Sequence, residues 1–269
     1  MRSALPHLHP AEKKLGELVC NFPGELAGYS ASELAQLAGV SNATVSRFIR
    51  RLGYPNYEEA RLHAREESQT GSRLYKAKTT DSDTANANAY EIADIENIRT
   101  TFSQVSFGDI QDLAKAMLDA RKLWIIGFRA GNSLASYLQW QLTQVIENVV
   151  SIPGSGHTMG EHLVSIDSSD LVIVFGIRRR VAQLDAILAS VAETGARLAY
   201  ITDEGAPVHE QAEWHLRCQT GSPGPLFSHV AIMALINALA NQTIELSSEG
   251  GKVRLAEIEA FNESLEELQ

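Results

Sequence analysis

Five short apolar segments between residues 120 and 220 constrain the fold of this chain more than any other feature. They occupy residues 123–128, 149–152, 171–175, 198–202 and, with weaker apolar character, 214–217. Continuous apolar runs of this length are typical of strands that are covered on both faces. Helical patterns fill the intervals, and strands that alternate with helices predict βαβ units. We therefore expect a doubly wound parallel sheet over residues 90–246, with helices on both sides.

Three further segments complete the chain. Residues 1–67 have the pattern of short helices broken by Gly and Pro, whereas residues 68–89 are polar, which is linker composition. Residues 247–269 have the pattern of an acidic C-terminal helix with apolar residues at helical spacing. This helix can pack onto its own domain or pair with a second copy, and we favour the first. The predicted fold class is α/β with an all-α N-terminal domain.

Residues 32–53 have the pattern of two short helices joined by a tight turn. Ser32 is a suitable N-cap for the first helix, and Gly39 ends it because the turn needs a left-handed backbone that Gly adopts at little cost. Ser41 then caps a second helix. The expected buried stripe of this second helix consists of Val45, Phe48, Ile49 and Leu52.

The opposite face of the second helix carries hydrogen-bond donors and no acid. In helix-turn-helix domains such a helix lies in the major groove, where its first residues reach base edges and later arginines contact phosphates. We assign Asn42, Thr44 and Arg47 to base edges. Arg50 and Arg51, and the Ser41 amide at the helix N-terminus, are assigned to phosphates. The full set of expected DNA-binding residues is Ser41, Asn42, Thr44, Ser46, Arg47, Arg50 and Arg51.

The charge distribution is compatible with DNA binding although the net charge is −10. Residues 1–67 contain eight Lys/Arg and eight Asp/Glu, and residues 41–54 contain three arginines and no acid. The acidity lies elsewhere, and residues 245–269 alone hold seven Glu. A local basic patch matters more for docking on DNA than the sum over the chain.

The motif Ala-Thr-Val-Ser-Arg-Phe at residues 43–48 is followed by Arg-Arg-Leu-Gly-Tyr at 50–54 and Tyr-Glu-Glu at 57–59. With these motifs, residues 10–65 resemble the helix-turn-helix of the RpiR/MurR family of sugar-responsive regulators. The resemblance implies a linker and then a sugar-isomerase (SIS) domain, an α/β fold that binds phosphosugars. It covers nearly the whole chain and is strongest in the first third.

The first candidate ligand-binding turn follows the strand at residues 123–128. Doubly wound folds bind ligands at the carboxyl edge of the sheet, and helix N-termini there favour anions. Arg129, Asn132 and Ser133 are the candidate contacts in this turn. The alternative is a plain glycine turn in which Asn132 or Ser133 only caps the following helix.

The second candidate turn follows the strand at residues 171–175 and contains Arg178, Arg179 and Arg180. Three arginines at a helix start oppose the helix dipole unless an anion lies among them. The alternative is that all three are solvated or pair with acids such as Glu161 or Asp185. Glu161 is also a candidate for lining the pocket, although a surface pair with His162 is an equal alternative.

This second turn departs from the SIS pattern, which usually places hydroxyl side chains there to hold the sugar phosphate. Residues 176–180 contain no hydroxyl, and Arg129 stands where small residues are common in the first turn. We therefore expect a small anionic metabolite bound through arginine, either a sugar phosphate, a sugar acid or a related carboxylate.

Together these features predict a transcription regulator. We expect it to bind double-stranded DNA at a two-fold operator as a homodimer or dimer of dimers, with effector binding changing its DNA affinity. No apolar run is long enough to cross a membrane and the N-terminus lacks a signal-peptide core, so a cytoplasmic location is expected. Cys20 and Cys218 match no metal or redox spacing, and no cofactor, metal or catalytic residue is predicted.

Two other functions remain open at this point. The first is an aldose–ketose sugar-phosphate isomerase with an accessory helical domain, in which Glu161, His162 or His229 is the base. The second is an interaction module in the N-terminal domain that binds something other than DNA, which the acid-free helix face disfavours.

Overall fold

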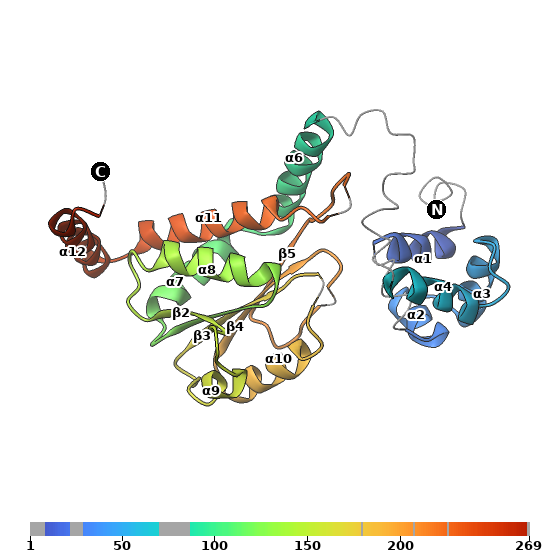
Figure 1. Cartoon of the computed structure of the whole chain (residues 1–269), viewed down its shortest axis with the longest axis horizontal. Coiled ribbons are helices and arrows are strands. Elements are labelled where there is room, and N and C mark those ends of the chain that lie inside the picture. Colours follow the sequence, from blue (N-terminus) through green and yellow to red (C-terminus); the bar gives the residue numbers. More distant parts are fainter. Residues whose placement is uncertain are drawn as a thin grey trace. The chain divides into compact units, whose positions relative to one another are not determined.

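The computed structural model describes residues 9–21, 29–69, 87–178, 180–206, 208–224 and 226–267, and the side chains of 17, 20, 21 and 65–69 are outside it. The chain divides into two compact units (Figure 1). The first ends at Ala85, and the second begins at Asn86. Of the expected linker at 68–89, residues 68–69 and 87–89 are helical and the rest lies outside the described residues.

The N-terminal unit is helical, as predicted. Its core contains Leu15, Val45, Phe48 and Ile49, each with no exposed surface. The described helices are α1 (Pro10–Asn21), α2 (Ala31–Leu37), α3 (Asn42–Arg51) and α4 (Tyr57–Gln69). The expected buried stripe of α3 is confirmed, with Leu52 half-buried beside it.

The start of α2 differs from the prediction. Ser30, not Ser32, is the N-cap: its side chain accepts the Glu33 amide hydrogen at 3.3 Å, and its own amide donates to Glu33 Oε2 at 2.7 Å. This reciprocal capping box requires a Glu three residues after the cap, which only Ser30 has. The Ser30 hydrogen bonds lower the pKa of the Glu33 carboxyl.

The second unit contains the expected parallel sheet. Its order is β2-β1-β3-β4-β5, and every pairing is parallel. The predicted strands are confirmed, and each end lies within one residue of its prediction. The strands are β1 (Leu123–Gly127), β2 (Val149–Ile152), β3 (Leu171–Gly176), β4 (Arg197–Asp203) and β5 (Trp214–Cys218).

Helices cover both faces of this sheet, so the domain is a three-layer sandwich (Figure 1). Alternate strand residues face opposite layers, with Leu123 and Ile125 in one core and Trp124 and Ile126 in the other. The helices are α6 (Ala87–Gln104), α7 (Phe107–Asp119), α8 (Ala130–Leu142), α9 (Met159–Leu163), α10 (Leu184–Glu193), α11 (Val230–Leu246) and α12 (Glu249–Leu265). Helices α7, α8 and α11 line the first core, and α9 and α10 the second.

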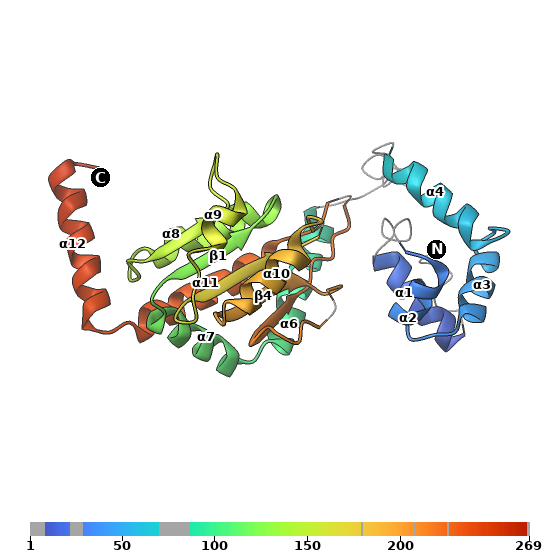
Figure 2. The same cartoon turned by 90° about the horizontal axis from the view of Figure 1, so that it is seen from below.

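Helix α12 does not pack along its own domain as we favoured. It projects from the end of the α/β domain (Figure 2), and Gly251 is its one buried residue. Arg254 Nε donates to the Thr143 carbonyl at 2.9 Å, while Phe261 and Leu265 are 67% and 62% exposed. Within the described residues no single helix is long and apolar enough to cross a membrane. Helices α11 and α12 together, which are bent relative to each other, have the length and composition of a span.

Candidate functional site

The turn before α3 has the geometry of a helix-turn-helix motif. Gly39 has a φ of +62°, the left-handed conformation expected of it. Ser41 is the N-cap of α3, and its Oγ accepts the Thr44 amide hydrogen at 3.2 Å. The turn and the cap fix the direction in which α3 leaves the core.

The exposed face of α3 includes four residues, besides the Ser41 cap, that we assigned to DNA contacts and whose side chains have no partner among the described residues of the helical domain. These are Asn42, Ser46, Arg47 and Arg50. No described residue forms an ion pair with Arg47 or Arg50, so their charges face solvent. An exposed, acid-free helix face with two arginines suits a phosphate-lined groove.

Two residues of the predicted DNA-binding set contact other residues of the helical domain. Thr44 is buried, with its Oγ1 3.0 Å from Ser41 Oγ, because it lies one turn before Phe48 on the core side of α3. The prediction that it faces outward was wrong. Arg51 is half-exposed, but its Nη1 donates to Glu12 Oε2 on α1 at 2.7 Å. This pair joins α3 to α1 and occupies the guanidinium that we assigned to a phosphate.

A second candidate site lies at the carboxyl edge of the sheet, where the strand order reverses between β1 and β3. In folds of this strand order, ligands bind at this switch point. Arg129, Asn132 and Ser133 all lie exposed at the start of α8. Arg129 has φ +56° and ψ −123°, which is unusual for a residue with a side chain, and strained backbone conformations of this kind cluster at functional sites.

The turn after β1 brings its backbone close to α8. A Cβ on Gly127 would lie 2.1 Å from the Gly131 carbonyl oxygen and 2.9 Å from the Ala135 Cβ. No residue with a side chain fits there without movement of the backbone. The two glycines therefore place the N-terminal amides of α8 directly at the end of β1.

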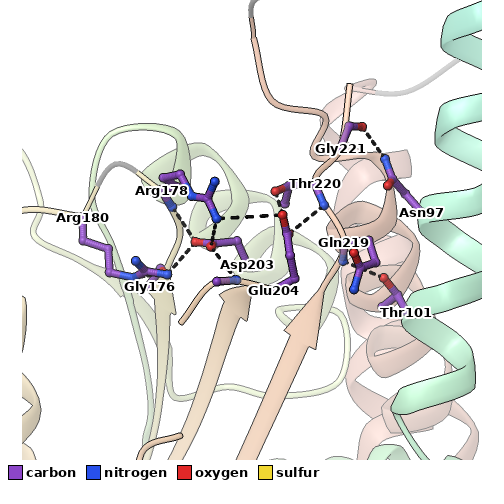
Figure 3. A network of polar contacts seen from close by, with 11 residues as sticks. Asn97, Thr101, Gly176, Arg178, Arg180, Asp203, Glu204, Gln219, Thr220 and Gly221 are labelled. Atoms are coloured by element: carbon purple, nitrogen blue, oxygen red, sulfur yellow. Dashed lines mark hydrogen bonds and ion pairs between the residues drawn. The ribbon is translucent and has the colours of Figure 1, made fainter. Parts of the chain in front are cut away.

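The turn after β3 contains an ion-pair cluster centred on Asp203 (Figure 3). The Asp203 carboxylate is fully buried at the end of β4. It accepts hydrogen bonds from Arg178 Nη2 at 2.9 Å, Arg180 Nη2 at 2.6 Å, the Arg178 amide at 3.0 Å and the Gly205 amide at 3.1 Å. Arg180 Nε also donates to the Gly176 carbonyl at 2.8 Å.

This cluster shows how two of the three arginines are paired in the structure. Arg178 and Arg180 pair with an acid, but the acid is Asp203, supported by Glu204, and neither Glu161 nor Asp185. Arg178 is buried and its guanidinium lies 4.9 Å from the Phe227 ring. The two arginines are therefore neutralised internally. Arg179 lies outside the described residues.

The remaining site candidates are Glu161 and the histidines. Glu161 lies on α9, and its Oε2 is 2.9 Å from Nδ1 of His157, with both side chains exposed; this hydrogen bond lowers the pKa of Glu161. His229 lies just before α11, where its Nε2 is buried and has no hydrogen-bond partner among the described residues. Burial lowers the pKa of His229, which favours the neutral form of its ring.

His215 belongs to a half-buried cluster at the edge of the sheet. Its ring stacks on Tyr200 with centroids 5.1 Å apart. Its Nδ1 accepts the His209 amide hydrogen at 3.4 Å, so its Nε2 carries the proton and donates to Thr202 Oγ1 at 3.0 Å. Burial, helped by the charge of Arg217, lowers the pKa of His215 to about 4.

We expect the α/β domain to lose stability as pH falls from 6.5, the ordinary pKa of His, to about 4. Over this range the unfolded chain binds a proton that folded His215 does not, so the free energy of unfolding rises with pH. The effect is roughly 1–2 kcal/mol after solvent screening of a half-buried ring. Urea unfolding at several pH values measures it. His215→Gln should flatten the dependence of the unfolding free energy on pH, and carboxylate effects cancel when the variant is compared with the wild type. Equal slopes in the two proteins would contradict the lowered pKa of His215.

The most important residues that sequence reasoning missed are Asp203 and Glu204. Asp203 is the last residue of β4 and Glu204 follows it, at the carboxyl edge where parallel strands end together. That position was a usable signal, because an acid there lies beside the arginine turn of the neighbouring strand.

Comparison with protein families matches both units of the chain. Residues 1–71 match the helix-turn-helix domain of the rpiR family, and residues 116–242 match the SIS domain. The two matches define a class of protein in which an N-terminal helix-turn-helix precedes a parallel α/β domain. The chain belongs to the RpiR family of helix-turn-helix transcriptional regulators.

Curated relatives carry regulator names. The chain is 24% identical over 211 residues to the HTH-type transcriptional regulator HexR of Pseudomonas aeruginosa, covering 77% of this chain and 73% of that protein. It is 21% identical over 251 residues to HexR of Escherichia coli, covering 89% and 85%.

Two solved structures share the fold. The sugar isomerase domain of an RpiR transcription factor from Sphaerobacter thermophilus is 24% identical with a TM-score of 0.58, covering 64% of this chain and 96% of that one. The Vibrio vulnificus NanR protein complexed with ManNAc-6P is 17% identical with a TM-score of 0.59, covering 98% and 97%.

Proposed function

We propose that this regulator binds a two-fold DNA operator through α3 and changes its affinity when a small anionic sugar derivative binds at the β1/β3 edge. The observation that supports it most is the exposed, acid-free face of a capped α3, with Arg47 and Arg50 unpaired among described residues. A two-fold operator requires an even number of subunits, so the active form is a homodimer or dimer of dimers acting in the cytoplasm.

In the proposed complex Asn42 and Arg47 contact base edges, and Arg50 and the Ser41 amide contact phosphates. Asn and Arg are the side chains that pair bidentately with adenine and guanine. Ser46 lies on the same exposed face and adds a hydroxyl donor. Thr44 and Arg51 are left out of this set because their side chains are engaged within the helical domain.

We expect replacement of Arg47 and replacement of Arg50 to affect DNA binding in different ways. Arg47→Ala should cost roughly 1–3 kcal/mol and relax preference at one base pair, whereas Arg50→Ala should weaken binding to all sequences and reduce the salt slope by about 1. Fluorescence anisotropy on an operator and its single-base variants, at two salt concentrations, separates these effects. Lys14→Ala on α1 is the matched control, and unchanged binding by both arginine variants would exclude α3 as the recognition helix.

The effector binds at the turn after β1 in this proposal. The start of α8 offers backbone amides, the Arg129 guanidinium and the Asn132 and Ser133 side chains to an anion. Arg178 and Arg180 contribute less than expected because their charges are already balanced by Asp203 and Glu204. Likeness to NanR, solved with ManNAc-6P, favours a sugar phosphate over the sugar acids and carboxylates that the arginines suggested. In this proposal Glu161, an exposed carboxylate on α9, contacts the sugar hydroxyls.

Thermal shifts of the purified protein with a panel of hexose phosphates and sugar acids test the effector site. We expect a sugar phosphate to raise the melting temperature, and Arg129→Ala and Ser133→Ala to remove the shift because both contacts at the α8 N-terminus are lost. Lys115→Ala, which changes an exposed charge on α7, should leave the shift intact. A shift that survives in both site variants would place the ligand elsewhere.

A further inference from the structure

Helix α6, the first element of the α/β domain, is attached to it in an unusual way. The two side chains that α6 buries are both polar, Asn97 and Thr101. Ile92 and Ile95 lie away from these two and are 60% and 40% exposed. Directed hydrogen bonds therefore contribute much of the attachment, and such bonds break with a small shift of either partner.

The bonds of α6 go to the segment that follows β5. Thr101 Oγ1 accepts the Gln219 amide hydrogen at 2.9 Å, and Asn97 Nδ2 donates to the Gly221 carbonyl at 2.6 Å. In the middle of the helix, Asp94 accepts the Ser228 hydroxyl at 2.5 Å. Spacings of three and four residues place Asp94, Asn97 and Thr101 on one face of α6.

The same segment is joined to the arginine turn through Glu204. Thr220 is buried, and its amide and hydroxyl donate to Glu204 Oε2 at 3.0 Å and 2.9 Å. The other carboxylate oxygen, Oε1, lies 3.8 Å from Arg178 Nη2. Figure 3 shows the resulting polar network, which runs from Arg180 and Arg178 through the two acids and Thr220 to Asn97 and Thr101 on α6.

We propose that this polar network transmits effector binding to α6, and through α6 to the chain segment that leads to the helical domain. The proposal rests on the proposed function, because it assumes an anion at the β1/β3 edge. Two arginines and two carboxylates balance in the free protein. An added anion competes with the carboxylates for the arginines, since like charges near a shared cation repel.

Glu204 is the acid that moves away from Arg178 in this competition. Asp203 is fully buried with four hydrogen bonds, whereas the Glu204 side chain is 22% exposed and its ion pair is long, at 3.8 Å. When Glu204 shifts, the buried donors of Thr220 lose their acceptor, which is costly unless the backbone moves with them. Gln219 and Gly221 are the neighbours of Thr220, so the contacts with Thr101 and Asn97 weaken.

Hydrogen–deuterium exchange of the full chain tests this route without knowledge of the effector. We expect Glu204→Ala to increase exchange of the α6 amides, residues 87–104, several-fold in the absence of ligand, and Glu204→Gln, which keeps an acceptor for Thr220, to increase it less. Asn97→Ala should act directly and give the same increase as Glu204→Ala. Inorganic phosphate, added as a probe to the wild type, should increase α6 exchange while protecting residues 129–134.

The matched control is Glu213→Ala, which removes a carboxylate from an exposed ion pair with Arg197. Unchanged α6 exchange in both Glu204 variants would overturn the proposal, and so would an equal increase in the control. Phosphate protection of residues 129–134 with no change in α6 would overturn it as well.

Operator binding separates this proposal from the proposed function. If α6 transmits the signal, the operator affinity of Asn97→Ala without effector should equal that of the wild type with effector. Added effector should then change the operator affinity of the variant less than twofold. If Asn97→Ala keeps the full effector response, the route is wrong although the regulator function stands. If the wild type selects no operator, the proposed function fails, while the exchange data still decide whether Glu204 controls α6.

Discussion

Asp203→Ala should destabilise the α/β domain by about 3–5 kcal/mol, because it leaves buried arginine charge without its partner. The lost carboxylate accepts four hydrogen bonds, two of them from the guanidinium groups of Arg178 and Arg180. Arg178 is itself buried and cannot regain full hydration when the acid is removed. Urea unfolding followed by tryptophan fluorescence measures the change, since all three tryptophans lie in the α/β domain.

Glu213→Ala provides the matched comparison for Asp203→Ala. Glu213 also forms an arginine pair with two hydrogen bonds, at 2.9 Å and 2.7 Å to Arg197, but the two side chains are 48% and 46% exposed. Solvent screens this pair, and its loss should cost about 0–1 kcal/mol. Similar losses in the two variants would show that the Asp203 cluster is not the structural centre of this edge of the sheet.

Gly127→Ala should destabilise the same domain by about 3 kcal/mol or more, because the new methyl group has no space. Its Cβ would lie 2.1 Å from the Gly131 carbonyl oxygen, which is backbone and cannot rotate away as a side chain would. Relief requires α8 to move away from β1. The variant should therefore also lose effector binding at the α8 N-terminus, in addition to its lower urea midpoint.

Gly160→Ala is the control for Gly127→Ala. Gly160 lies in α9, and a Cβ there meets nothing within 4 Å. Ala is the better helix former by about 1 kcal/mol, so this variant should be neutral or slightly stabilising. A Gly127→Ala protein as stable as Gly160→Ala would mean that the β1–α8 contact is looser than the structure shows.

The sheet could be predicted from sequence because its strands are buried on both faces. Such strands are continuous apolar runs whose ends are marked by polar residues, and the predicted boundaries agreed within one residue. Helix surfaces were harder to predict. Trp140 on α8 is 64% exposed despite its large apolar ring, since a helical position on its own does not tell which face meets the sheet.

Parts of the candidate sites could not be predicted because they depend on pairing between distant segments. The three arginines after β3 stood out in the sequence, but Asp203, the partner of two of them, belongs to the next strand, β4. Asp203 lies beside these arginines only because β3 and β4 pair in the folded sheet. In the same way, Arg51 looked available for DNA until the fold brought Glu12 to it. We predicted that Thr44 is on the outer face of α3, but it lies on the buried face. The predicted N-cap and core stripe of the same helix were correct.

Capture of genomic DNA fragments by the purified protein tests the central claim most directly. The wild type and the Arg47→Ala/Arg50→Ala double variant are run side by side, and both substitutions lie on the exposed face of α3, away from the core. We expect the wild type to enrich fragments that share a two-fold motif and the double variant to enrich none of them. Equal enrichment of the same fragments by both proteins would show that α3 does not read DNA.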